Sequence, residues 1–215
     1  MTSSKLLPRT TSNVISLLAE IAPPILDARL PSGHCVPGTR VGIDVLTHFG
    51  IQARACVTRV AAGDRVGLKV FDAQSRGRFP ELKRVPRLKL CGLATHNPTL
   101  HAGEYDRHLV IIAENRTLVD LTAGFFGQPG AEMPSAVISL VDDAFLKGRS
   151  RLSVKASSSA TIRYHSDPSN VSHFEFRSWQ GLAVTRELTR MIIATIVPRL
   201  APAHGCDAQE HRHCA

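Results

Sequence analysis

The chain has 215 residues, of which 43% are hydrophobic and 20% charged, which fits one folded domain with a small appendage and excludes a disordered protein. No apolar stretch approaches the roughly 18 residues of a membrane span, and the N-terminus lacks the apolar core of a secretory signal, so a cytoplasmic protein without a membrane span is expected. The formal net charge of +8 is compatible with an anionic partner but does not single one out.

The first fifty residues predict two helical segments. Apolar residues recur with helical spacing over residues 12–30, where a Pro-Pro pair predicts either two short helices or one kinked helix. Residues 36–49 read as a second helix, because Pro37 is tolerated in a first turn and Gly50 is typical of a helix end. Cys35 is therefore expected at the N-terminus of this second helix.

The middle of the chain predicts strands. Residues 51–60 and 66–73 are rich in β-branched and apolar side chains and read as a hairpin around a turn-like AAGDR segment. After a basic stretch, residues 88–93 are a candidate short strand, which a loop follows. The strongest strand signal is the pair of apolar runs at residues 108–113 and 117–121, which three polar residues join into a predicted hairpin.

The C-terminal part is expected to complete the same domain. Residues 135–145 are predicted to form a helix, residues 159–165 and 172–177 a hairpin, and residues 182–200 a closing amphipathic helix. Residues 201–215 are polar enough to be a loose tail.

Three residues carry the candidate chemistry. A thiol attacks carbonyl carbons as the thiolate, and a helix N-terminus beside an imidazole lowers the pKa of that thiol. Cys35 has the helix position, and the odd number of cysteines without a CxxC pair favours a reactive thiol over a disulfide framework. Closing the hairpin brings His108 opposite Leu121 or within one or two positions of it, so Asp120 can accept a hydrogen bond from the imidazole. We therefore expect Cys35 to be the nucleophile, His108 the base and Asp120 the residue that orients the base.

This order of a helix-start Cys, a strand His and an Asp in the following strand resembles the transglutaminase-like superfamily, which is related in architecture to papain-like cysteine proteases. The similarity covers residues 32–122. The nucleophile helix ends in Phe-Gly-Ile-Gln-Ala-Arg (residues 49–54), similar to the Gly-Ile-x-Ala-Arg segment of the family, and Asp120 stands in a Val-Asp-Leu-Thr context. The chain departs from many members in having Leu109 directly after the His and no Trp before Trp179.

The resemblance implies an α+β fold, in which the nucleophile helix packs on a small antiparallel sheet and the terminal helices cover the remainder. Residues 1–31 would be an N-terminal helical extension, residues 32–130 the transglutaminase-like catalytic core, residues 131–200 the completion of the same domain, and residues 201–215 a flexible tail. The activity implied is that of a cysteine hydrolase or acyltransferase that forms a thioester with a peptide or protein substrate, protease or amidase activity being favoured and no cofactor required.

Other interpretations stay open. His96 or His101, in the predicted loop, is an alternative base, and Asn115 is an alternative orienting residue, although turn chemistry explains it fully. The same fold without catalysis would be a protein- or peptide-binding module. The basic segment at residues 76–89 leaves nucleic-acid binding as a less favoured alternative, since the segment has no aromatic platform.

Two further groups of residues are given structural interpretations. His34 adjoins the nucleophile but reads as a surface histidine, because neighbouring side chains at a helix start diverge in direction. The C-terminal tail contains side chains that can bind zinc or copper, but their spacing matches no standard finger, so no metal is assigned. They are His204, Cys206, His211, His213 and Cys214.

Overall fold

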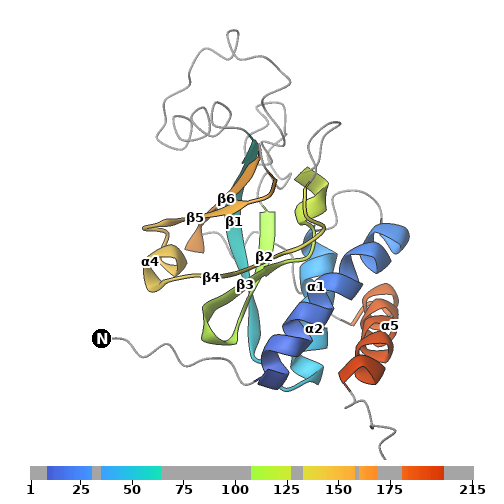
Figure 1. The fold of residues 1–215 in the computed structure, drawn as a ribbon. Coiled ribbons are helices and arrows are strands. Elements are labelled where there is room, and N and C mark those ends of the chain that lie inside the picture. The colour runs from blue at the N-terminus through green and yellow to red at the C-terminus, as the bar shows by residue number, and fades with distance from the viewer. Residues whose placement is uncertain are drawn as a thin grey trace, which may run out of the picture.

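The structure of the protein is a computed structural model that describes residues 9–30, 35–63, 108–126, 133–157, 160–168 and 181–200. These residues form an α+β fold in which three helices gather on one side of a sheet (Figure 1). The helices are α1 (Arg9–Arg29), α2 (Cys35–His48), α4 (Asp143–Leu146) and α5 (Ala183–Leu200), with 3-10 turns η3 (Glu114–Arg116) and η4 (Ala123–Phe126). The strands are β1 (Ala53–Gly63), β2 (His108–Ala113), β3 (Thr117–Asp120), β4 (Val137–Leu140), β5 (Arg151–Lys155) and β6 (Thr161–Ser166).

The strands form one nearly closed antiparallel sheet in the order β4-β3-β2-β1-β6-β5. Its longest strand, β1, changes partner along its length. The first half of β1 pairs with β2, and the second half, from Thr58 onward, pairs with β6. Because β1 belongs to both halves, the sheet curves, and inward side chains of β6 meet those of β2 and β3 in one core.

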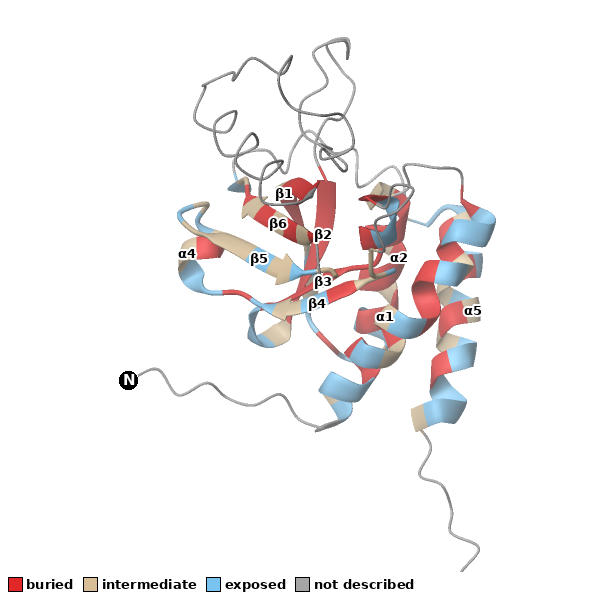
Figure 2. Cartoon of the chain, turned by 45° about the horizontal axis from the view of Figure 1, so that its top comes forward, coloured by how far each residue is buried: buried red, intermediate tan, exposed pale blue. Residues whose placement is uncertain are grey.

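Side chains alternate between the two faces of the sheet and build two separate cores. On the outer face, α1, α2 and α5 pack against strand residues that include Ile111 and Val119. On the inner face, the sheet encloses an apolar core that contains Val110, Leu118 and Ile162. Figure 2 shows the buried residues concentrated along the strands and on the sides of the helices that face them.

Helix α1 is a single helix that contains both Pro23 and Pro24, so of the two predicted alternatives, two short helices or one kinked helix, the single helix is observed. The turns on both sides of the prolines are buried against the outer core, and this packing outweighs the loss of a helical hydrogen bond at a proline. The same helix packs along α5, where the Arg199 guanidinium donates to both carboxylate oxygens of Glu20, at 2.9 and 3.2 Å.

The end of α2 is built as the sequence predicts. Gly50 has a φ of 73°, in the left-handed region that favours glycine. Its N–H donates to the Thr47 carbonyl at 3.0 Å, while the Ile51 N–H donates to the Leu46 carbonyl at 2.9 Å. This pair of bonds is the Schellman arrangement, which satisfies the last carbonyls of a helix and turns the chain into the next strand.

Gly42 allows the middle of α2 to lie directly on the sheet. A Cβ atom at this position would overlap the Cδ1 atoms of Ile111 and Leu121, which project from β2 and from the residue after β3. The absence of a side chain at Gly42 therefore allows α2 to lie close to the strands that carry His108 and Asp120.

The predicted hairpin at residues 108–121 is confirmed. Ile111 pairs with Val119 and Ala113 with Thr117, and the short 3-10 turn η3 joins the strands. Asn115 in this turn has a φ of 55°, a conformation that Asn tolerates better than most residues. Continuing the register toward the open end of the hairpin places His108 beyond the last observed pair, on the same face of the sheet as Asp120.

The prediction of a helix at residues 135–145 is wrong for its first half. Residues Val137–Leu140 form strand β4, which pairs with β3, and only Asp143–Leu146 are helical. The β-branched side chains of Val137 and Ile138 suit a strand, and the outer edge of β3 supplies the hydrogen-bonding partner. Helical periodicity over so short a segment was outweighed by this tertiary pairing.

Of the hairpin predicted around residues 166–170, the first strand is present as β6, and the second strand at residues 172–177 lies outside the described residues. Strand β6 pairs with β1 and with β5 (Arg151–Lys155), a strand that has too few apolar residues to stand out in the sequence. The predicted turn at residues 61–65 is wrong in its first part, because Ala61–Gly63 continue β1 and pair with β6. The closing helix is confirmed as α5.

Several predictions fall outside the described residues. They are the strands at residues 66–73 and 88–93, the loop at residues 95–106, the basic segment at residues 76–89 and the tail at residues 201–215. Among the helices that are described, none is long and apolar enough to cross a membrane.

Candidate active site

Cys35 is the first residue of α2, where backbone N–H groups have no partner within the helix. Its side chain is half-buried and packs against Val57 of β1 and Leu109 of β2. The sulfur is therefore held between the positive end of a helix and the beginning of strand β2.

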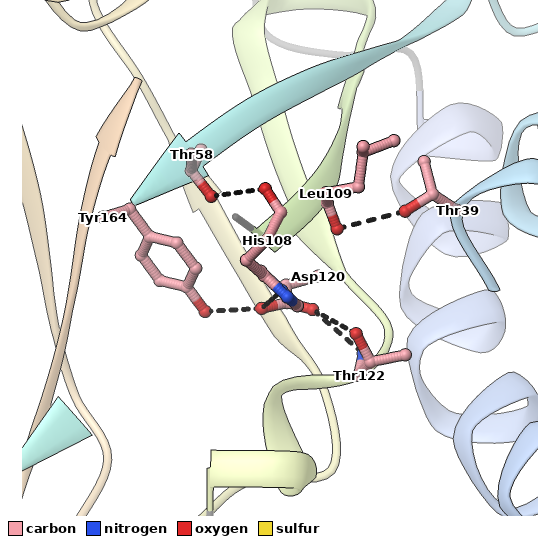
Figure 3. Close-up of polar contacts among 7 residues, drawn as sticks. All are labelled: Thr39, Thr58, His108, Leu109, Asp120, Thr122 and Tyr164. Carbon is pink, nitrogen blue, oxygen red and sulfur yellow. Dashed lines mark hydrogen bonds and ion pairs between the residues drawn. The ribbon is translucent and has the colours of Figure 1, made fainter. Parts of the chain in front are cut away.

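His108 and Asp120 lie at the same end of the β2–β3 pair. His108 is the first residue of β2 and Asp120 the last of β3, and both are buried. The His108 Nε2 lies 2.8 Å from Asp120 Oδ2, as Figure 3 shows. Since an ionised carboxylate only accepts hydrogen bonds, Nε2 carries the proton in this contact. The pairing expected from the sequence is present.

Asp120 is surrounded by donors. Thr122 donates to Oδ1 twice, from its backbone N–H at 2.9 Å and from its hydroxyl at 3.2 Å. The Tyr164 hydroxyl donates to Oδ2 at 2.9 Å, so this oxygen is shared between Tyr164 and His108 (Figure 3). Such a shell allows a carboxylate to stay charged in the interior, where an unpaired charge is very costly.

Cys35 lies near enough to the His108 imidazole and to the Leu109 backbone N–H for both to favour its thiolate form. Because Nε2 is engaged by Asp120, Nδ1 is the ring nitrogen left to interact with the sulfur. The imidazole thus links a sulfur on one side with a carboxylate on the other.

The pKa shifts of the three groups describe one coupled system. Burial opposes the thiolate, but the hydrogen bond and the positive charge of His108 outweigh it and lower the pKa of Cys35. Burial also opposes the imidazolium, yet the Asp120 carboxylate raises the pKa of His108 to about 10. Burial likewise opposes the carboxylate, and the charge of His108 lowers the pKa of Asp120. All three shifts act in the same direction, because each favours the charged form: thiolate, imidazolium and carboxylate.

Three contacts fix the helix and the strand that meet at this site. The Thr39 hydroxyl, one turn into α2, donates to the Leu109 carbonyl at 3.1 Å. The Thr58 hydroxyl of β1 donates to the His108 carbonyl at 3.2 Å. The Phe126 ring meets the His108 ring edge-on with centroids 4.9 Å apart, which limits rotation of the imidazole.

Two residues of the site were missed from the sequence. Thr122 follows Asp120 by two positions, a spacing at which an Asp side chain commonly accepts the backbone N–H, so this contact had a local signal. Tyr164 had only the inward alternation of Ile162, Tyr164 and Ser166 along β6. Nothing local to Tyr164 indicates that it reaches Asp120.

Of the residues considered as alternatives, Asn115 is described and three histidines are not. Asn115 lies in the η3 turn at the opposite end of the hairpin from His108. His34, His96 and His101 lie outside the described residues. Across the described ranges, no group of three potential ligands gathers to hold a metal ion.

Comparison with known proteins gives no match to this chain, whether against family models, curated proteins or solved structures.

Proposed function

We propose that the protein is a cysteine hydrolase or acyltransferase of the transglutaminase-like kind, which acts on a peptide or amide bond through a thioester. One observation carries this proposal. A buried imidazole joins a thiol of lowered pKa at a helix N-terminus to a buried carboxylate, which is the arrangement that nucleophilic catalysis by a thiol requires.

The sequence of bond changes follows from the positions of the three groups. The Cys35 thiolate attacks the substrate carbonyl carbon, a C–S bond forms, and the carbonyl oxygen becomes an oxyanion. Backbone N–H groups at the start of α2 are available to stabilise that charge. As the oxyanion collapses, the C–N bond breaks and the His108 imidazolium gives its Nδ1 proton to the leaving amine.

The thioester is resolved in the second half of the reaction. Neutral His108 takes a proton from water or from an acceptor amine, which attacks the thioester carbon. The C–S bond then breaks, so the thiolate and the imidazolium are restored. Asp120 holds the tautomer and orientation of the ring throughout and stabilises its positive charge. Protease or amidase activity is favoured within this proposal.

A thermodynamic argument supports a functional role over a purely structural one. For packing alone, a neutral thiol at Cys35 would suffice against Val57 and Leu109. An apolar pair in place of His108 and Asp120 would avoid the desolvation cost of a buried ion pair. The described site instead brings together three ionisable groups, Cys35, His108 and Asp120, which shift one another's pKa values. Perturbed pKa values of this kind are characteristic of functional sites.

The test is to trap the acyl-enzyme. The protein is incubated with a panel of activated acyl esters and peptidyl amides, quenched in acid, and analysed by peptide mass spectrometry. The expected result is an acyl group on Cys35 that is absent in Cys35→Ala and retained in Cys56→Ala. Absence of any acyl adduct and of any amide cleavage in the wild type would contradict the proposal and favour a non-catalytic binding module.

A further inference from the structure

Tyr164 reaches Asp120 across the interior of the curved sheet. In the sheet order, β2 and β1 stand between β3, which carries Asp120, and β6, which carries Tyr164. The Tyr164 hydroxyl nevertheless lies 2.9 Å from Asp120 Oδ2, because the sheet curves round and both side chains point to its inner face (Figure 3). The contact thus joins the two halves of the sheet at the site.

The Tyr164 hydroxyl is a group whose burial calls for a specific partner. The side chain is fully buried in the inner core, where a phenylalanine ring would fill nearly the same space without a polar atom. Within the described residues, its hydrogen-bond partner is Asp120. The hydroxyl therefore has its effect through that carboxylate.

Tyr164 completes the hydrogen bonding of Asp120. A carboxylate offers about four acceptor positions. At Asp120 these are filled by the Thr122 N–H and hydroxyl on Oδ1, and by His108 and Tyr164 on Oδ2. The two donors on Oδ2 compete for the same negative charge. Each one limits how strongly that oxygen attracts the proton of the other.

We propose that Tyr164 is a positioning residue of the active site. Its hydroxyl holds Asp120 Oδ2 toward His108 and weakens the hydrogen bond that this oxygen accepts from His108 Nε2–H. This inference rests on the proposed function, because it assigns a role within the same reaction. Its chemical consequence concerns His108. A strong hydrogen bond from Nε2–H to Asp120 stabilises the imidazolium and makes its Nδ1–H a poorer acid for the leaving amine. Sharing Oδ2 with Tyr164 weakens that bond and keeps the Nδ1 proton transferable.

The test is the imidazole pKa of His108, measured by NMR in Tyr164→Phe. A Cys35→Ala background removes the neighbouring thiolate, so that Asp120 is the charged partner that remains beside the ring. With the competing donor gone, Oδ2 bears more charge toward His108, and its pKa is expected to rise by roughly 0.5 to 1 unit. The matched control is Ile162→Val on the same strand and inner face, which loosens the core without touching Asp120 and leaves the pKa of His108 unchanged.

An unchanged or lowered pKa of His108 in folded Tyr164→Phe would overturn the inference, and so would an equal rise in Ile162→Val. Should Tyr164→Phe not fold, Asp120→Asn supplies the second variant, read from the infrared stretching frequency of the Tyr164 hydroxyl. A shift of that frequency is expected if the hydroxyl donates to Asp120, and no shift would overturn the inference. The two proposals can fail separately. If the protein is not an enzyme, acyl trapping gives no adduct, while the pKa of His108 still responds to Tyr164→Phe.

Discussion

Cys35 and Cys56 are both withdrawn from water, yet the pKa of Cys35 is lowered and that of Cys56 is raised. Burial opposes the thiolate at both positions. Cys56 lies in the inner core with the Ser166 hydroxyl at 3.5 Å, and this neutral partner does not offset the burial. Cys35 faces the imidazolium of His108, which does. The comparison teaches that, where burial opposes the thiolate at both positions, the partner of the thiol decides the direction of its pKa shift.

The largest effect is expected from removing the two thiols in turn. Cys35→Ala should abolish rapid alkylation by iodoacetamide at pH 6 and reduce any acyl-transfer activity by a factor on the order of 10³ or more. Cys56→Ala should leave both properties intact and lower stability by about 1 kcal/mol. Peptide mass spectrometry after short exposure to the reagent locates the modified residue. Faster labelling of Cys56 than of Cys35 would reverse the comparison.

The next effect comes from the carboxylate. Asp120→Ala leaves four donor groups without their acceptor in the interior: His108 Nε2–H, the N–H and hydroxyl of Thr122, and the Tyr164 hydroxyl. The unfolding free energy is expected to fall by about 3 to 5 kcal/mol, and the rate of Cys35 alkylation should fall as well, because the imidazolium loses its partner. Urea denaturation gives the first quantity and timed alkylation the second. A variant with unchanged stability would mean that Asp120 is not buried among these donors.

The pH dependence of stability sharpens the same comparison. The pKa of His108 is raised from 6.5 to about 10, so its contribution is fully present below 6.5 and is lost as the pH rises toward 10. The difference in unfolding free energy between the wild type and His108→Gln should therefore shrink steadily from pH 6.5 upward. Denaturation curves of both proteins across this range test the sign. A difference that grows with pH would contradict the charged state assigned to the imidazole.

The smallest effects are expected where α2 is fitted to the sheet. Gly42→Ala introduces a Cβ that overlaps the flexible ends of Ile111 and Leu121, which should cost about 1 to 3 kcal/mol and displace the helix that carries Cys35. Alkylation of Cys35 should slow several-fold while that of Cys56 under denaturing conditions stays the same. The control is Thr47→Ala, on the exposed side of the same helix, which should leave the rate of Cys35 alkylation unchanged. Equal rates in Gly42→Ala and the wild type would show that the approach of α2 does not position the sulfur.

The part of the site that could be predicted is the part encoded by neighbours in the sequence. Cys35 was placed by the helix that follows it, and His108 and Asp120 by a hairpin whose turn fixes the register. These relations depend on local periodicity and turn chemistry, which are legible in one sequence.

The remainder depends on contacts between distant strands. The sequence of β4 predicts a helix, but its pairing with β3 makes it a strand. The sequence of β5 gives no clear strand signal, and its pairing with β6 holds it extended. Tyr164 reaches Asp120 only through the curvature of the whole sheet. A single sequence holds no local trace of such curvature, so the residue that completes the carboxylate shell could not be foreseen.

The most direct test of the account is the ionisation of Cys35 itself. The thiolate absorbance of the native protein is titrated with pH, and the curve of Cys35→Ala is subtracted to isolate one thiol. The account predicts a midpoint below the ordinary value of 9.0, which moves upward in His108→Gln. A midpoint at or above 9.0 in the wild type, or one that His108→Gln leaves unchanged, would contradict the proposed thiolate–imidazolium pair.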